Sequence, residues 1–269
     1  MALRKYIENM SMDQIEKSGQ CFRIKNIGEN RYSVITREYY LEVEDFGDGS
    51  FDFYCTEEEF ESVWKDYFDL DTDYGQIIKD IDEADMYLLA AGEAGSGIRI
   101  LKQDLWEMIV TFIISQRMSI PRIASIVESL CECLGTKYEK NGHVFYSFPT
   151  AEQMADKDLS QFSLGYRDKY LSRLAKAVAY GEFSLDYLGE EHELKEYLDY
   201  LCSIYGVGVK VANCVVLFGM HKLDAFPIDT WISRIVDREY NGAFPVEKYN
   251  YAGVLQQYIF YYERLLNGR

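Results

Sequence analysis

Residues 204–214 read Ile-Tyr-Gly-Val-Gly-Val-Lys-Val-Ala-Asn-Cys, and this stretch decides the fold. Two glycines separated by one residue, Gly206 and Gly208, predict a tight turn between two amphipathic helices that together span about residues 194–219. The first N–H groups of a helix have no partner inside it, so such a turn suits a phosphate. Lys210 follows within the first turn of the second helix.

A second motif, Ala-Phe-Pro-Ile-Asp-Thr-Trp-Ile-Ser-Arg, occupies residues 225–234. Asp229 comes two positions after Pro227, where a helix is expected to begin. Taken singly, Lys210 is typical of a solvated helix lysine and Asp229 of a helix cap. Together, an amine and a carboxylate at helix starts beside a phosphate-binding turn indicate amine-based chemistry on a nucleic acid.

The charge of the chain is unevenly distributed. Its 269 residues carry a net charge of −17, which argues against a general nucleic-acid binder. However, residues 38–61 hold ten acids and no Lys or Arg, whereas residues 166–178 hold four cations and one acid. Because the local potential at the binding face matters more than the sum, we expect modest, strongly salt-sensitive binding of nucleic acid.

Cysteine and histidine usage predicts no metal centre. The six cysteines include no Cys-x-x-Cys pair, and the three histidines form no cluster. We therefore expect reduced thiols in a cytoplasmic protein, nucleoid-associated if the source is bacterial. The sequence contains no run of about 18 apolar residues, so no membrane association is expected.

The hydrophobic pattern predicts an α+β fold. Residues 20–55 contain β-branched and aromatic runs separated by glycine turns, which indicates an antiparallel sheet. From about residue 57 the period becomes helical. We therefore predict an N-terminal antiparallel β-sheet domain over residues 1–75 and a mostly α-helical domain over residues 76–269.

These motifs resemble the helix–hairpin–helix (HhH-GPD) DNA glycosylase superfamily. Its signature is a Gly-x-Gly turn, a lysine two residues on in bifunctional members, and Pro-x-Asp one helix later. Further segments are similar to the 8-oxoguanine DNA glycosylase branch, and together with the hairpin they cover about residues 18–265. They are Ser18–Arg23, Phe112–Ile123, Gly165–Tyr170 and Ala252–Phe260, with Cys214 four residues after Lys210.

The resemblance implies a role for each matching residue. Lys210 and Asp229 would be catalytic. The residues implied in base recognition are Gly19, Cys214, Gln256 and Phe260. The residues implied in DNA binding are Gly206, Val207, Gly208, Arg117, Arg122, Tyr166, Arg167 and Trp231.

The resemblance also implies a mechanism on duplex DNA that contains oxidised guanine. The damaged base is flipped out and Lys210 displaces it through a Schiff base, after which β-elimination nicks the strand. The family implies no required cofactor, with a possible structural cation at the hairpin carbonyls, and we expect a monomer. The chain departs from the family at Arg117-Met118-Ser119, where asparagines are usual, and at Trp231, where the human-type branch has histidine.

Alternative functions stay open. A related glycosylase could act on another damaged or mismatched base, although Lys210 disfavours the monofunctional branches. A non-catalytic DNA-binding module would use the hairpin for phosphate contact alone. The acidic residues 38–61 could instead bind a basic protein partner.

Overall fold

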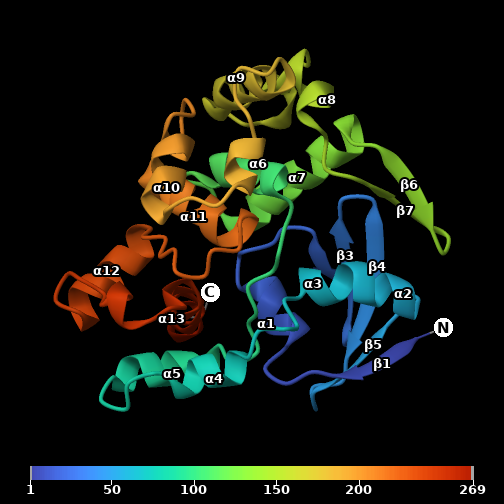
Figure 1. The fold of residues 1–269 in the computed structure, drawn as a ribbon. Coiled ribbons are helices and arrows are strands. Elements are labelled where there is room, and N and C mark those ends of the chain that lie inside the picture. Colours follow the sequence, from blue (N-terminus) through green and yellow to red (C-terminus); the bar gives the residue numbers. More distant parts are fainter. Residues whose placement is uncertain (1, 268–269) are drawn as a thin grey trace. The chain divides into compact units, whose positions relative to one another are not determined.

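The computed structural model describes residues 2–267, which form two compact units made of interleaved segments (Figure 1). Unit 1 contains residues 2–33, 41–102 and 221–267. Unit 2 contains residues 34–40 and 103–220. The units thus divide the chain differently from the sequence boundary at residue 75, because the C-terminal helices pack in unit 1 with the sheet-bearing segment.

Unit 1 holds the larger sheet and the C-terminal helices. Its elements are β1 Leu3–Tyr6, α1 Met12–Lys17, β2 Ile24–Asn26, β3 Arg31–Thr36, β4 Tyr39–Asp45, β5 Ser50–Phe53, α2 Glu57–Glu59, η1 Phe60–Trp64, α3 Lys65–Tyr67, α4 Tyr74–Lys79, α5 Met86–Ala94, α12 Thr230–Glu239, η4 Val246–Lys248 and α13 Ala252–Leu266. Residues 34–40, which comprise the end of β3, the turn and the start of β4, are counted with unit 2.

Unit 2 is mostly helical. Its elements are α6 Leu105–Ser115, α7 Ile120–Leu134, β6 Lys137–Lys140, β7 His143–Tyr146, α8 Ala151–Ala155, η2 Leu159–Phe162, α9 Arg167–Ala179, η3 Asp186–Gly189, α10 Leu194–Cys202 and α11 Val209–Gly219. The expected α+β architecture, with an N-terminal antiparallel sheet followed by a helical body, is confirmed.

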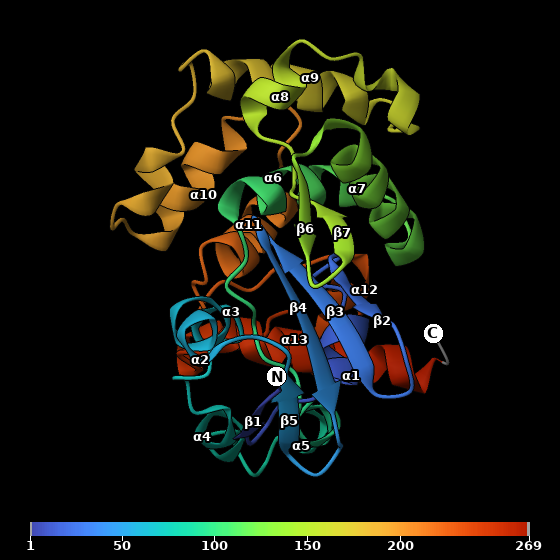
Figure 2. The same ribbon diagram turned by 90° about the vertical axis from the view of Figure 1, so that its right-hand side faces the viewer.

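The five-stranded sheet has the order β1-β5-β4-β3-β2, and Figure 2 shows these strands side by side. Along β5 the side chains alternate, so that Phe51 and Phe53 are fully buried between less buried neighbours. The ring of Phe53 meets those of Phe60 and Phe68 edge-on, at centroid distances of 4.9 and 5.9 Å. This aromatic cluster fixes the segment after the sheet against the sheet face.

In unit 1, α13 packs against both α5 and α12. A Cβ at Gly95 would lie 2.8 Å from the ring of Tyr258, so α5 and α13 approach closely where position 95 lacks a side chain. At the other contact, Glu263 accepts hydrogen bonds from Tyr87 and Arg238. These contacts fix α12 and α13, which carry three of the predicted site residues.

In unit 2, α6 is buried along nearly its whole surface and packs against α7, α9 and α11. The rings of Phe112 in α6 and Phe218 in α11 stack at 5.4 Å. Asp104 caps α6, since its side chain accepts the N–H of Glu107 at 3.0 Å. Helix α7 ends before Gly135.

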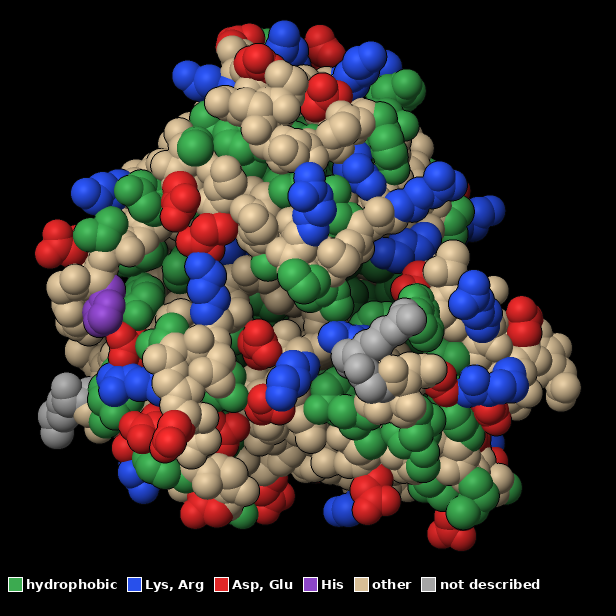
Figure 3. All heavy atoms as spheres, turned by 180° about the vertical axis from the view of Figure 1, so that it is seen from behind, with side chains coloured by type: hydrophobic (Ala, Val, Ile, Leu, Met, Phe, Trp, Pro, Cys, Tyr) green, Lys and Arg blue, Asp and Glu red, His purple; other side chains and the backbone are tan. Residues whose placement is uncertain are grey.

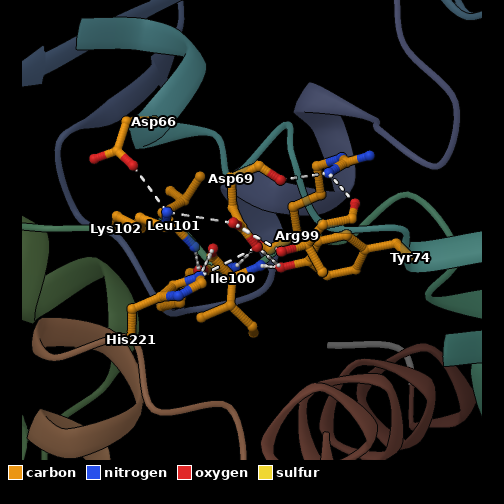
Figure 4. A network of polar contacts seen from close by, with 10 residues as sticks. Asp66, Asp69, Tyr74, Arg99, Ile100, Leu101, Lys102 and His221 are labelled. Atoms are coloured by element: carbon orange, nitrogen blue, oxygen red, sulfur yellow. Dashed lines mark hydrogen bonds and ion pairs between the residues drawn. The ribbon is translucent and has the colours of Figure 1, made fainter.

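Asp69 collects polar contacts at the place where the chain leaves unit 1, after residue 102, and returns to it, at residue 221 (Figure 4). His221 Nε2 lies 3.2 Å from one carboxylate oxygen, Tyr74 donates to the same oxygen at 2.9 Å, and Lys102 Nζ lies 3.6 Å from the other. His221 Nε2 is also 3.1 Å from the carbonyl of Ile100. With acceptors on both sides, Nε2 carries a proton.

Asp69 is buried, and burial alone raises the pKa of a carboxyl group. The hydrogen bond and charge of His221, together with the hydrogen bonds from Thr72 and Tyr74, outweigh this effect and hold the pKa of Asp69 below its usual range. The carboxylate therefore stabilises the fold above the unfolded-state pKa of about 3.9, and this contribution is lost as the pH falls through the lower folded-state pKa.

We predict that Asp69→Asn lowers the free energy of unfolding by about 3 kcal/mol at neutral pH, because the half-buried Lys102 and His221 then face a neutral amide in place of a buried carboxylate. Asparagine tolerates the left-handed backbone at this position, where φ is +51°, so backbone strain does not contribute. Urea unfolding monitored by tryptophan fluorescence measures the change.

Asp66→Asn is the matched control, because Asp66 binds the same Lys102 at 2.8 Å but has an exposed side chain. We expect a change below about 1 kcal/mol. The difference in the free energy of unfolding between wild type and Asp69→Asn should also become smaller as the pH falls from 5 toward 3. If Asp69→Asn lowered the free energy of unfolding as little as Asp66→Asn, the stabilising role of the Asp69 carboxylate would be contradicted.

Candidate functional site

The turn between α10 and α11 has the geometry predicted from its glycines. Gly206 has φ of +93°, which side chains rarely adopt, and a Cβ there would lie 2.3 Å from the ring of Tyr170 in α9. Val207 is buried, and its N–H donates to the carbonyl of Ile204 at 3.0 Å. Position 206 therefore requires glycine for reasons internal to the folded chain.

The second glycine is not required by the folded chain. Gly208 caps α11 with φ of −108°, an ordinary value, and a Cβ there would meet nothing within 4 Å. It is exposed, with the first N–H groups of α11 next to it. A glycine that the protein does not need leaves room for a ligand to approach the backbone closely, as a phosphate would.

Lys210 lies in the first turn of α11 and is half-buried. Its ammonium group lies 5.6 Å from the centre of the Phe112 ring, and within the described part of unit 2 it forms no ion pair. Cys214 lies one turn further along the same side of the helix and is buried. An amine without a carboxylate partner is accessible for reaction, and the apolar residues of α11 hold its position.

Two other loops of unit 2 carry predicted DNA-binding residues. Arg117 and Arg122 are exposed on the loop between α6 and α7 and on the first turn of α7, and Arg117 has a left-handed φ of +52°. Tyr166, immediately before α9, is 47% exposed. These side chains have the exposure needed to enter a gap in a base stack.

Gln116 and Arg167 tie these loops to the hairpin. The amide of Gln116 donates to the carbonyl of Gly206 at 3.0 Å. Arg167 is buried and donates to the carbonyls of Leu164, at 3.0 Å, and of Gln116. The structure thus places the Arg167 guanidinium on backbone carbonyls, where it holds the loops that present Arg117 and Tyr166.

Asp229 caps α12 in unit 1, as predicted. One of its carboxylate oxygens accepts the N–H groups of Trp231 at 2.9 Å and Ile232 at 2.8 Å. Both Asp229 and Trp231 are half-buried. These two bonds hold the carboxylate in a fixed position at the start of the helix.

Gly19 lies between two anchored residues at the end of α1. Ser18 donates to the carbonyl of Ile15 at 2.7 Å, and Gln20 bonds to the backbone of Arg99 and Leu101 at 2.9 Å each. Gly19 itself has φ of +77°. The orientation of its carbonyl is therefore set by the backbone on both sides.

Gln256 and Phe260 lie on one side of α13, because they are four residues apart. Arg264 continues this row, with its guanidinium carbon 5.8 Å from the Phe260 ring, and donates to the carbonyl of Lys17 in α1. Because Arg264 reaches the last residue of α1, the side of α13 that carries Gln256 and Phe260 faces the end of α1, which Gly19 follows. Gln256 is buried and accepts a hydrogen bond from Gln257 at 3.3 Å.

The predicted residues therefore form two groups, one in each unit. The hairpin, Lys210, Cys214 and the loop residues belong to unit 2, whereas Gly19, Asp229, Trp231, Gln256 and Phe260 belong to unit 1.

The sequence interpretation assigned no role to Gln116, Gln20 or Tyr205. The available signal was weak: Gln116 is a lone amide at the end of an apolar helix. Among residues 2–267, no cluster of His, Cys, Asp and Glu suits a metal ion, and no helix has the length and apolar character to cross a bilayer.

Two family models together match most of the chain. Residues 2–109 match the model described as 8-oxoguanine DNA glycosylase, N-terminal domain. Residues 110–243 match the model described as HhH-GPD superfamily base excision DNA repair protein.

Similar proteins are known in sequence and in structure. The 8-oxoguanine glycosylase/lyase of Clostridium acetobutylicum, solved with duplex DNA containing cytosine opposite 8-oxoguanine, is 34% identical; the match covers 99% of this chain and 98% of that one, with a TM-score of 0.89. MBOgg1, solved with a low-affinity DNA ligand, is 35% identical over 99% of this chain and 96% of that one, with a TM-score of 0.91. The N-glycosylase/DNA lyase of Saccharomyces cerevisiae is 33% identical over 54% of this chain and 42% of its own length. The chain spans about half the length of the curated relatives it matches.

The two glycines of the hairpin should differ in what they contribute to stability. We predict that Gly206→Ala lowers the free energy of unfolding by about 2–5 kcal/mol, since it adds backbone strain and a clash with Tyr170. Gly208→Ala should cost less than about 1 kcal/mol, because a poorer cap is partly offset by a less flexible unfolded chain. Denaturant unfolding of both variants measures these changes. Equal losses of unfolding free energy would contradict the conclusion that the folded chain does not require glycine at position 208.

Proposed function

The chain belongs to the HhH-GPD superfamily of base excision DNA repair proteins, with an N-terminal domain of the 8-oxoguanine DNA glycosylase family, and from this membership we propose that it excises 8-oxoguanine from duplex DNA and nicks the strand. The observation that carries the proposal is Lys210, a half-buried amine without an ion-pair partner in its unit, one turn after a phosphate-binding hairpin. A relative solved with 8-oxoguanine DNA supports the substrate class.

Binding of the damaged duplex uses both groups of residues. The hairpin Gly206–Gly208 binds a backbone phosphate through the N–H groups of Gly208 and of the first turn of α11, since the N–H of Val207 already donates to Ile204. Arg117 and Tyr166 fill the gap that the extruded nucleotide leaves, while Arg122 contacts the opposite base and Trp231 the backbone. Unstacking costs a few kcal/mol, which the phosphate contacts and pocket stacking offset.

Each of the proposed base-recognition residues makes a different contact with the damaged base. The carbonyl of Gly19 accepts the N7–H of 8-oxoguanine, a donor that guanine lacks. The amide of Gln256 pairs with the base edge, and Phe260 and Cys214 each supply a stacking contact to the base. The buried position of Gln256 supports this role, since an amide held among packed side chains reads a hydrogen-bond pattern without rearranging.

Lys210 carries the covalent chemistry. Its nitrogen attacks C1′ of the damaged nucleotide while the bond from C1′ to the base breaks, and the bonding electrons leave with the base, which takes up a proton. Loss of a proton from the amine and opening of the sugar ring give a Schiff base. Removal of a C2′ proton then expels the 3′ phosphate by β-elimination, and water releases the lysine.

Asp229 stabilises the positive charge that develops on the sugar as the base departs. Its anchorage by two backbone N–H groups supports this role, because a carboxylate fixed in advance needs no rearrangement during the reaction. In the second half of the reaction it assists proton transfer.

No cofactor takes part in this proposed chemistry. A structural cation at the hairpin is part of the proposal: the carbonyl oxygens of Ile204 and Gly206 each accept one hydrogen bond and retain a second lone pair for such an ion. We further propose that the protein acts as a monomer where the DNA lies, in the cytoplasm or on the nucleoid.

The first prediction concerns the nucleophile. Borohydride reduction should trap wild-type protein covalently on a duplex with 8-oxoguanine opposite cytosine and not on an undamaged duplex. Lys210→Gln should bind the damaged duplex yet give no adduct and no strand scission, because glutamine offers no nucleophilic amine.

Lys195→Gln, which removes an exposed lysine from α10, should behave as wild type. Full scission by Lys210→Gln would refute the assigned nucleophile. Adducts on a different damaged base, in a panel of lesion duplexes, would favour another glycosylase of this superfamily. DNA binding without base release, unaltered by Lys210→Gln, would favour a binding module.

The second prediction concerns the carboxylate. Asp229→Asn should slow base release about 10²–10³-fold in single-turnover kinetics, because the amide carries no charge. Stability should hardly change, since asparagine caps a helix as well as aspartate does. Asp237→Asn, an exposed acid on the same helix, is the control and should leave the rate unaltered. A slowdown of less than about tenfold would argue against the proposed role.

A further inference from the structure

A row of exposed cations runs along α9. Lys169, Arg173 and Lys176 are spaced by four and three residues, so they project from the same side of the helix. Leu171 and Leu174 face the opposite way and are buried. Part of the local excess of positive charge in residues 166–178 is thus concentrated on one accessible strip.

Aromatic rings connect this strip to the hairpin. The guanidinium carbon of Arg173 lies 5.0 Å from the centre of the Tyr205 ring, and Tyr205 directly precedes Gly206. Tyr205 is 55% exposed and meets the ring of Tyr170 edge-on at 5.1 Å. A guanidinium stacked on a ring is already ordered, so it loses less freedom when it binds a phosphate.

Two of the three cations lack a counter-charge. Lys176 lies 4.0 Å from the carboxylate of Asp156, whereas Lys169 and Arg173 form no ion pair with any residue in 2–267. Asp168 is near in sequence, but its carboxylate accepts the N–H of Lys169 at 2.5 Å at the start of the helix. The surface carries many acidic side chains, and positive ones still gather locally (Figure 3). Such unpaired cations create a local field that attracts a polyanion.

We propose that Lys169 and Arg173, the latter oriented by Tyr205, bind backbone phosphates of the undamaged duplex next to the nucleotide held by the hairpin. The proposal rests on the proposed function, and it extends the DNA contact from the hairpin amides along α9. Contacts to phosphates carry no sequence information but contribute affinity that falls with salt. They give an acidic protein a local attraction to DNA.

Salt dependence of duplex binding tests the proposal. The affinity of each full-length variant for an undamaged duplex is measured by fluorescence anisotropy over a series of salt concentrations. The slope of log affinity against log salt should become shallower by about 0.9 for each lost phosphate contact, in both Lys169→Gln and Arg173→Gln. Lys176→Gln is the matched control on the same helix and should leave the slope unaltered, because Asp156 already neutralises that charge.

Tyr205 provides a second test of orientation. Tyr205→Phe keeps the ring beneath Arg173 and should bind as wild type, whereas Tyr205→Ala should weaken binding without altering the slope as much as Arg173→Gln does. Equal slopes for all three cation variants would overturn the proposal. No duplex binding by the wild type would overturn the proposed function as well, whereas normal lesion cleavage with unaltered slopes would overturn the α9 contact alone.

Discussion

The contact between Gly206 and Tyr170 is the constraint on which the arrangement of the hairpin and its neighbouring loops in unit 2 depends. The turn lies so close to the ring that a Cβ at position 206 would come within 2.3 Å of it. Gln116 then bonds to the carbonyl of the same glycine, and Arg167 bonds to the carbonyl of Gln116. One residue without a side chain thus allows three loops to meet, and the first turn of α11, with Lys210, follows directly from them.

The two glycines show how a fold and a function can require the same residue type for different reasons. The folded chain requires glycine at position 206, since φ there is +93° and a Cβ would clash with the ring of Tyr170. Gly208 has an ordinary backbone and open space beside it, so packing does not explain it. The proposed phosphate contact would explain it, which makes Gly208 the more informative of the two about function.

The sequence predicted the elements that depend on local pattern and missed those that depend on long-range contacts. The cap at Asp229 and the turn at Gly206 follow from the chemistry of neighbouring residues, and the structure has both. The burial of Arg167 could not be predicted, because its partners are carbonyls whose position depends on tertiary packing. The division into interleaved units could not be predicted for the same reason, because it depends on α13 packing against α5, which is far away in the sequence.

The departure at Arg117-Met118-Ser119 can be understood from the neighbouring backbone. That loop begins at Gln116, whose amide and carbonyl are both bonded to other loops, so its path is fixed by contacts that do not involve the three altered side chains. In the proposed complex, side chains other than asparagine alter what the loop presents to the opposite base, while Gln116 anchors the start of the loop. The exposed Arg117, held in a left-handed conformation next to this anchor, then brings a charge where the family usually brings an amide. Any altered preference for the opposite base should therefore arise from side-chain chemistry at this position and not from a different placement of the loop.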